Sequence, residues 1–152
     1  MLEALLDNLS LLLIVAGVIL VAVITVLIAP KKSKNKRKHE KSKNTELAFE
    51  EELITLYQNR DYKVERTPKY DFGADLLMTT PDGITVAIRA KKQSKLVGLT
   101  AVQEVYAAQA YYKTQEAWVI TTSAFTDSAK KLSRVCDVRL INGEQLATGL
   151  FR

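Results

Sequence analysis

The chain begins with a long uncharged segment. No residue between Asn8 and Pro30 is charged, and the stretch LLLIVAGVILVAVITVLIA is almost wholly aliphatic. About 20 apolar residues in a helix cross the ~30 Å hydrocarbon core of a bilayer, and a helix of a globular core would show a polar stripe that is missing here. The preceding residues, MLEALLDN, carry acidic rather than basic side chains, which disfavours a cleaved signal peptide. The pattern predicts one retained transmembrane helix within residues 1–30.

Residues 45–152 carry shorter patterns that predict an α/β domain. Apolar positions at helical spacing follow the capping residues Asn44 and Thr45 and predict a helix to about Asn59. Within it Glu50 falls on the apolar face, where a carboxylate needs a partner because burying it alone is costly. The segment YKVERT then predicts a strand, and DFGADLLMTT, PDG and ITVAIRAKK together predict a β-hairpin.

Helices and strands alternate in the rest of the domain. Thr100 and Gln103 predict a capping box at the start of a helix to about Lys113, which gives Gln103 a structural role. The strand AWVIT, a helix capped by Thr126, the strand VRLI and a short helix after Asn142 follow. An antiparallel hairpin followed by β-α-β units predicts a mixed sheet flanked by helices.

The predicted hairpin brings charged side chains together. Pairing across a turn near Pro81 and Asp82 puts Asp75 opposite residue 88 or 89. Strand alternation then sends Arg89 and Lys91 to the face on which Asp75 projects. An ordinary cross-strand ion pair explains this geometry as well as a functional site does, so both interpretations stay open.

The basic excess of the chain lies directly after the apolar segment. Residues 31–44, KKSKNKRKHEKSKN, hold eight lysine or arginine residues against Glu40, about +7. Since the whole chain carries +5 and Glu3 and Asp7 supply −2, residues 45–152 are left near zero. Positive charge flanks the cytoplasmic side of a span, which predicts an inner or plasma membrane protein with its N-terminus outside and its domain in the cytoplasm. We expect 31–44 to be a flexible linker, although binding to lipid headgroups or DNA phosphates is the alternative.

The cysteine and histidine counts exclude much chemistry. Cys136 is the only cysteine, so no intramolecular disulfide forms, and its apolar neighbours favour a packed side chain over a nucleophile. His39 is the only histidine and lies in the basic segment. This removes histidine-dependent triads, histidine bases and His-bearing zinc sites from the domain. There is no glycine-rich phosphate loop either. An active site here is left with carboxylates, lysine and arginine, either alone or with a hard metal ion.

A series of motifs in the domain carries a family resemblance. In order they are Phe49-Glu50, DFGAD at 71–75, VAIRAK at 86–91, TTSAFT at 121–126 with Ala129 following, and the ending LINGEQL. At these spacings the set resembles the Mrr-type restriction endonuclease family, within the wider PD-(D/E)xK nuclease-like group. The resemblance runs from about Leu47 to the C-terminus. It implies a restriction-endonuclease-like mixed β-sheet flanked by helices, here preceded by one transmembrane helix.

The resemblance also implies roles for single residues. Asp75 matches the metal-binding aspartate, Glu50 the helix glutamate that helps hold the metal, and Lys91 the lysine that positions or activates the attacking water. The backbone carbonyl of Ala90 is a further metal ligand by the same resemblance. The implied protein is a membrane-anchored DNA endonuclease that depends on Mg²⁺ or Mn²⁺. Contacts to its DNA partner are expected from Arg89, Lys92 and Lys95.

One position departs from the family pattern. The family has glutamate or glutamine two residues before the motif lysine, where this chain has Arg89. Arginine does not ligate metals and stays protonated. Two alternatives to the endonuclease follow, both held at the membrane: an inactive nuclease-like module that binds DNA, or a module that binds a protein partner. A homodimer is compatible with each of them.

Overall fold

The computed structural model of the protein describes residues 16–19, 21, 32–68 and 72–149. The chain divides into two units, Met1–His39 and Glu40–Arg152, and the second carries the sheet. The transmembrane segment predicted within 8–30 falls almost entirely outside the described residues. Among those that are described, no helix combines the length and the apolar character needed to cross a bilayer.

The second unit is built on a five-stranded mixed sheet in the order β1-β2-β3-β4-β5. The pairs β1–β2 and β2–β3 are antiparallel, whereas β3–β4 and β4–β5 are parallel. The predicted order of helices and strands is confirmed. The elements are α2 (Lys32–Gln58), β1 (Lys63–Arg66), β2 (Leu76–Thr79), β3 (Thr85–Lys91), α3 (Leu99–Tyr112), β4 (Glu116–Thr121), α4 (Asp127–Val135), β5 (Val138–Ile141) and α5 (Gly143–Thr148).

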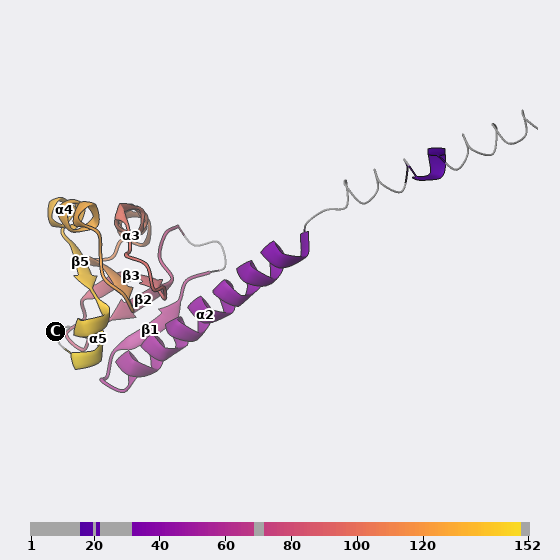
Figure 1. The fold of residues 1–152 in the computed structure, drawn as a ribbon. Helices are drawn as coiled ribbons and strands as arrows, with labels where there is room; N and C mark the ends of the chain where they lie inside the picture. Colours follow the sequence, from indigo (N-terminus) through magenta and orange to yellow (C-terminus); the bar gives the residue numbers. More distant parts are fainter. Residues whose placement is uncertain (1–15, 20, 22–31, 69–71, 150–152) are drawn as a thin grey trace, which may run out of the picture. The chain divides into compact units, whose positions relative to one another are not determined.

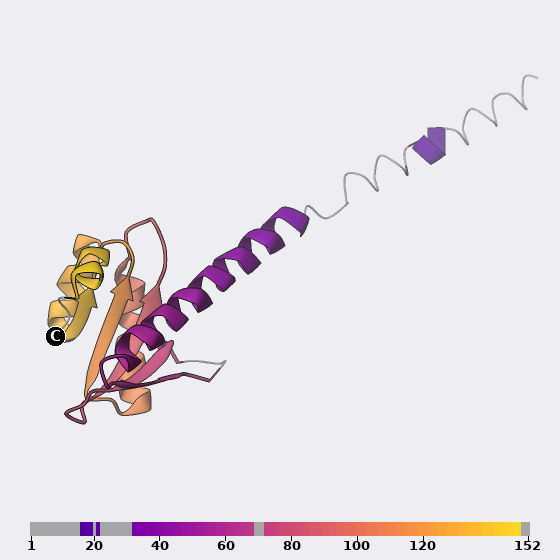
Figure 2. The ribbon, with the colours of Figure 1, turned by 90° about the horizontal axis from the view of Figure 1, so that it is seen from below.

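Helices cover both faces of the sheet. In Figure 1, α3 and α4 lie on one side of the strands and α5 lies on the other. Figure 2, which is seen from below, shows α2 and α5 in front of the sheet. The buried residues form two clusters, one between the sheet and α2 and one between the sheet and α3 with α4. The domain is therefore a three-layer α/β/α arrangement.

The alternation of β3 assigns its side chains to these two layers. Ile88 is fully buried in the cluster with Phe49 and Leu53 of α2. Ala87 is fully buried in the opposite cluster, against Val102 of α3. Full burial of a side chain such as Leu53 contributes roughly 2 kcal/mol. Both faces of β3 are therefore covered, as is usual for a strand of a sheet with helices on both sides.

The first helix is longer than the sequence predicts. We expected it to start at Asn44 or Thr45 after a flexible linker, but α2 begins at Lys32, so the predicted coil is wrong from Lys32 onward. The reason is that the segment from Lys32 to Gln58 contains neither glycine nor proline and is rich in lysine, arginine and glutamate, which favour helix. A capping residue ends up in the middle of a helix when the residues before it also favour helix.

The predicted capping box at the next helix is also wrong. The N-cap of α3 is Gly98, in an extended conformation with no side-chain capping bond, so Thr100 lies inside the first turn. The cause is tertiary. Val97 forms a parallel bridge to Phe125, and its amide donates to the Ala124 carbonyl (2.8 Å), which fixes where the chain enters the helix.

The cap predicted at Thr126 is confirmed, and the last helix begins after Asn142 as predicted. The Thr126 hydroxyl accepts from the amide of Ala129 at the start of α4. Asn142 and Gln145 form a full capping box at the start of α5.

Gly73 fixes the approach of the loop before β2 to α3. Its φ is +103°, a left-handed conformation that favours glycine. A Cβ built on Gly73 would lie 2.2 Å from the carbonyl oxygen of Glu104 in α3. Only a residue without a side chain therefore lets this loop pass so close to the helix.

We expect Gly73→Ala to lower the free energy of unfolding by about 3 kcal/mol, because the backbone strain and the collision with α3 both add to the cost. Gly83→Ala is the matched control. Gly83 also has a positive φ (+86°) but has nothing within 4 Å of a built Cβ, so we expect a loss of only about 1 kcal/mol. Urea unfolding of the full chain in detergent, followed by fluorescence of its single tryptophan, Trp118, measures both. Equal losses in the two variants would contradict the close approach.

Candidate active site

Asp75 and Arg89 form the centre of a cluster of charged residues at one end of the β2–β3 hairpin. Leu76 pairs with Ile88, so the preceding residue, Asp75, falls opposite Arg89 as the hairpin pattern predicted. The Arg89 guanidinium donates from Nη1 to Asp75 Oδ1 at 2.6 Å. Both side chains are largely buried, with exposed fractions of 14% for Asp75 and 15% for Arg89. Such a charge-assisted bond is shorter and stronger than one between neutral groups.

The second oxygen of Asp75 is also held by β3. The backbone N–H of Ala90 donates to Asp75 Oδ2 at 2.7 Å. On the other side, Thr67 fastens the loop: its amide donates to the Asp75 carbonyl (3.0 Å) and its hydroxyl to the Ala74 carbonyl (2.7 Å). The Asp75 carboxylate is thus fixed in orientation, which a catalytic or ligating group requires.

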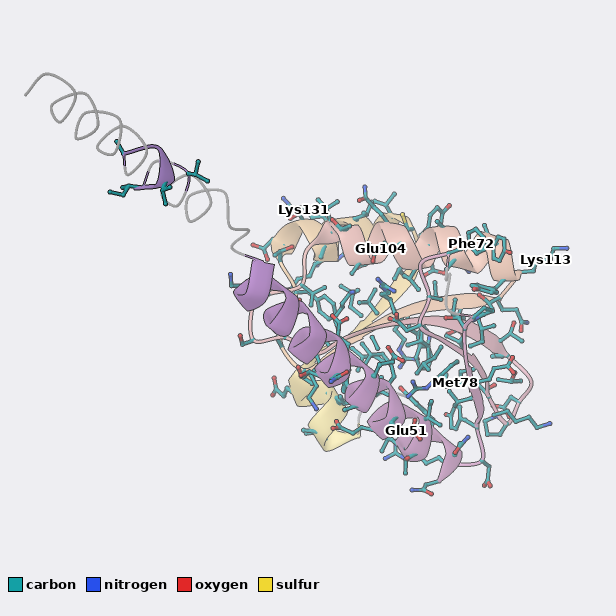
Figure 3. The ribbon with its side chains drawn as sticks, turned by 90° about the vertical axis from the view of Figure 1, so that its right-hand side faces the viewer. Glu51, Phe72, Met78, Glu104, Lys113 and Lys131 are labelled. Carbon is teal, nitrogen blue, oxygen red and sulfur yellow. The ribbon has the colours of Figure 1, made fainter. Side chains whose placement is uncertain are left out.

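Glu104 of α3 is a second acidic partner of Arg89. Arg89 Nε donates to Glu104 Oε2 at 3.0 Å, and Glu104 is 36% exposed. Figure 3 shows Glu104 on α3 and Glu51 on α2, on opposite sides of the sheet. Arg89 therefore links the loop before β2 to the helix on one face of the sheet.

Glu50 reaches the same cluster from α2. Its side chain is 13% exposed, and Arg66 of β1 lies 3.5 Å away, so the predicted inward carboxylate has the partner that it needs. Burial raises the pKa of Glu50, and the nearby negative charge of Asp75 raises it further, while Arg66 opposes both effects. One acid from α2 and one from the loop before β2 thus lie within electrostatic reach of each other.

Lys91 ends β3, two residues after Arg89. Its carbonyl accepts from the Thr121 hydroxyl (2.7 Å) and the Thr122 amide (3.3 Å), which ties this end of β3 to β4. Within the part of the chain that the structure describes, the half-buried Lys91 side chain makes no ion pair or hydrogen bond. The ammonium group of Lys91 is thus available to an incoming anion.

The three residues predicted to contact DNA lie in different surroundings. Arg89 is inside the cluster, held by two carboxylates. Lys92 bonds to Glu52 of α2 at 2.8 Å and lies 5.7 Å from the centre of the Phe49 ring. Lys95 is exposed in the segment between β3 and α3.

The oxygen atoms of the cluster suit a hard divalent cation. Asp75 and Glu50 offer carboxylates. The N–H and C=O of one residue point to the same side of a strand, so the Ala90 carbonyl faces the Asp75 side as well. Oxygen ligands of this kind are those that Mg²⁺ accepts. Among the described residues, no three side chains of the types His, Cys, Asp and Glu converge as a metal cage. The residues therefore fit an open site with two carboxylates and a carbonyl, with Arg89 beside it.

Two functional neighbours were missed by the sequence analysis. Arg66 was assigned only to a strand, and Glu104 to no role, although both contact the predicted acids or Arg89. A signal for Glu104 existed. It is the only charged residue in the α3 sequence LTAVQEVYAAQAYY. A lone charge in an otherwise uncharged helix is a candidate partner for a charge elsewhere in the fold.

A mixed sheet between helices, with an aspartate before one strand, a lysine at the end of the next and a glutamate on the covering helix α2, defines a restriction-endonuclease-like domain. The family model Mrr_cat, restriction endonuclease, matches residues 42–150. The chain belongs to this restriction endonuclease family, and the predicted resemblance is confirmed at that level.

One of the similar solved structures supports the fold, and two others are less similar. A crystal structure of a protein of unknown function superimposes with a TM-score of 0.51 at 17% identity, over 59% of this chain and 54% of that one. A repair endonuclease from Pyrococcus abyssi gives 0.48 at 19% identity, over 62% and 45%. The complex of EndoMS with double-stranded DNA gives 0.49 at 19% identity, over 64% and 44%. The matched part spans about half of each of those chains. No curated protein matches in sequence.

The raised pKa of Glu50 predicts a pH dependence of stability. From its ordinary value of 4.5 up to the raised value, the folded state binds more protons than the unfolded state. The free energy of unfolding therefore falls as pH rises through that window and stays lower above it. We expect Glu50→Gln to remove this fall and to be more stable than the parent at pH 7. Urea unfolding of the full chain between pH 4 and 8 tests this. Glu65→Gln, at an exposed position of β1, should keep the parent profile. An unchanged profile in Glu50→Gln would contradict the assignment.

Proposed function

We propose that this protein is a membrane-anchored, Mg²⁺-dependent DNA endonuclease whose active site is the cluster around Asp75. The observation that carries the proposal is that two largely buried carboxylates, Glu50 of α2 and Asp75 of the loop before β2, each lie beside an arginine in one charged cluster. The negative charge of Asp75 disfavours that of Glu50, and a divalent cation between them would relieve that repulsion. The family to which the chain belongs supports the same chemistry.

In this proposal Asp75, Glu50 and the Ala90 carbonyl hold the metal ion. When bound, the ion supplies Lewis-acid polarisation of a phosphoryl oxygen and lowers the pKa of a water molecule. Lys91 contributes a fixed positive charge. Because its ammonium has no acidic partner among the described residues, it is free to orient the attacking water and to stabilise the charge that develops on the phosphate.

DNA would approach along the segment that follows β3. Lys95 is exposed there, and the ion pair of Lys92 with the 60% exposed Glu52 is readily exchanged for a phosphate. Arg89 would contact a phosphate only after releasing a carboxylate. Since the domain as a whole is nearly neutral, we expect few phosphate contacts and a shallow dependence of DNA affinity on salt. Cutting both strands of a duplex in one encounter needs two sites, so a homodimer is part of the proposal.

Lys91→Ala should reduce nicking of supercoiled plasmid by at least about 100-fold, because one charge-stabilising group is lost at the phosphate. The assay uses the purified full chain in detergent with Mg²⁺, Mn²⁺ or EDTA. Lys63→Ala is the matched control, since Lys63 is an exposed lysine on β1, and it should cut like the parent. Normal cutting by Lys91→Ala, or cutting in EDTA, would contradict the proposed mechanism.

A second candidate is a nuclease-fold module that binds DNA without hydrolysing it. The observation in its favour is the 2.6 Å bond from Arg89 to Asp75, since a guanidinium there neutralises the aspartate as a metal ion would. For this candidate we expect DNA binding that falls with salt with the same shallow slope and is weakened in Lys91→Ala, with no cutting in any metal. In the same assay, cutting that appears only in Arg89→Gln would identify the arginine as the cause.

The membrane anchor within residues 8–30 has a direct test, since Cys136 is the only cysteine of the chain. Cys136 is partly exposed at the end of α4. With the domain in the cytoplasm, we expect an impermeant maleimide to label Cys136 in inside-out membrane vesicles and not in right-side-out ones. The variant Leu2→Cys/Cys136→Ala should show the reverse. Release of the protein by carbonate at pH 11, or labelling of Cys136 from the outside, would contradict the topology.

A further inference from the structure

Arg89 is shared between two carboxylates that differ in how firmly they are held. Asp75 is fixed by the Ala90 N–H as well as by Arg89. Glu104 meets Arg89 through Oε2 at 3.0 Å and is more than a third exposed. The guanidinium therefore uses two of its nitrogens on two acids, one from the loop before β2 and one from α3.

The position of Glu104 relative to Asp75 is set by the backbone. The carbonyl of Glu104 is the group that Gly73 approaches so closely that no Cβ fits. Gly73 precedes Asp75 by two residues, so the loop that carries the aspartate is packed directly on the helical turn that carries the glutamate. The distance between the two carboxylates thus depends on the fold and not on side-chain freedom alone.

Charge balance gives this arrangement a consequence. The two carboxylates share one guanidinium, so the three groups together keep a net negative charge. A divalent cation at Asp75 would repel Arg89 at short range, where Coulomb energies are large in a partly buried site. Without Glu104, Arg89 would give up one counter-charge more on leaving Asp75 and would compete more strongly with the cation for that residue. With Glu104, the guanidinium keeps an acidic partner in both states.

We propose that Glu104 is a positioning residue of this site. Glu104 keeps the Arg89 guanidinium in an ion pair when a divalent cation binds at Asp75. A site with arginine at this motif position can therefore accept a metal ion. This inference rests on the proposed function, because it requires that Asp75 takes part in metal binding. It adds a role for Glu104 that the motif residues do not supply.

The test is a double-mutant cycle on metal affinity, without DNA. Isothermal titration of Mn²⁺ into the full chain in detergent compares the parent with Glu104→Gln, Arg89→Gln and the double variant. We expect Glu104→Gln to weaken Mn²⁺ binding about tenfold and Arg89→Gln to strengthen it. In the double variant the affinity should return to that of Arg89→Gln alone, because Glu104 has no arginine left to hold.

Controls separate this role from others. Glu65→Gln removes an acid on β1 and should leave the Mn²⁺ affinity unchanged. An equal loss of affinity in this variant would show that only the net charge of the domain matters. If Glu104→Gln weakens binding as much in the Arg89→Gln background as in the parent, Glu104 acts as a ligand and the inference is wrong. The inference about Glu104 is also wrong if Glu104→Gln binds Mn²⁺ like the parent while Asp75→Ala loses binding. In that case the proposed function is still supported, because Asp75 is needed for the metal. Absence of Mn²⁺ binding in the parent and in Arg89→Gln would overturn both.

Discussion

The site depends on the fastening of Asp75 to β3. One carboxylate oxygen receives Arg89 and the other receives the Ala90 N–H, so the loop before β2 is fixed at both oxygens of one side chain. Arg89 carries the connection onward to α3 through Glu104. A largely buried ion pair contributes little net stability, but loss of one member leaves an uncompensated charge that is costly. The pair therefore acts mainly as a geometric constraint that aligns a loop, a strand and a helix.

Much of this arrangement is local and was predictable. The turn PDG and the alternation of ITVAIRAKK determine the hairpin register, and the register alone brings Asp75 to Arg89. The helical spacing around Glu50 likewise turns it inward. These predictions depend on neighbours within a few residues, or directly across a hairpin, where periodicity carries the information. The sheet order follows from the hairpin and the two β-α-β units.

What could not be predicted depends on contacts between distant segments. The start of α3 is set by the bridge between Val97 and Phe125, which overrides the capping signal of Thr100. The contact of Glu104 with Arg89 depends on how α3 is rotated on the sheet, and a helix with few charges gives a weak amphipathic signal for that rotation. The prediction of where α2 starts failed for a different reason. Two local signals, capping and helix propensity, competed at Asn44, and propensity prevailed.

Glu104 contributes to the molecule in two separable ways. Its carbonyl provides the surface on which Gly73 packs, and every amino acid at position 104 offers the same carbonyl. Its carboxylate meets Arg89, and only an acid of suitable length offers that. Position 104 can therefore change its side chain while the loop–helix contact persists, whereas position 73 cannot. During evolution, substitutions at this partly exposed position of α3 can change the charge of the site without changing the backbone fold. Related domains could then share one backbone and still differ in whether they cut.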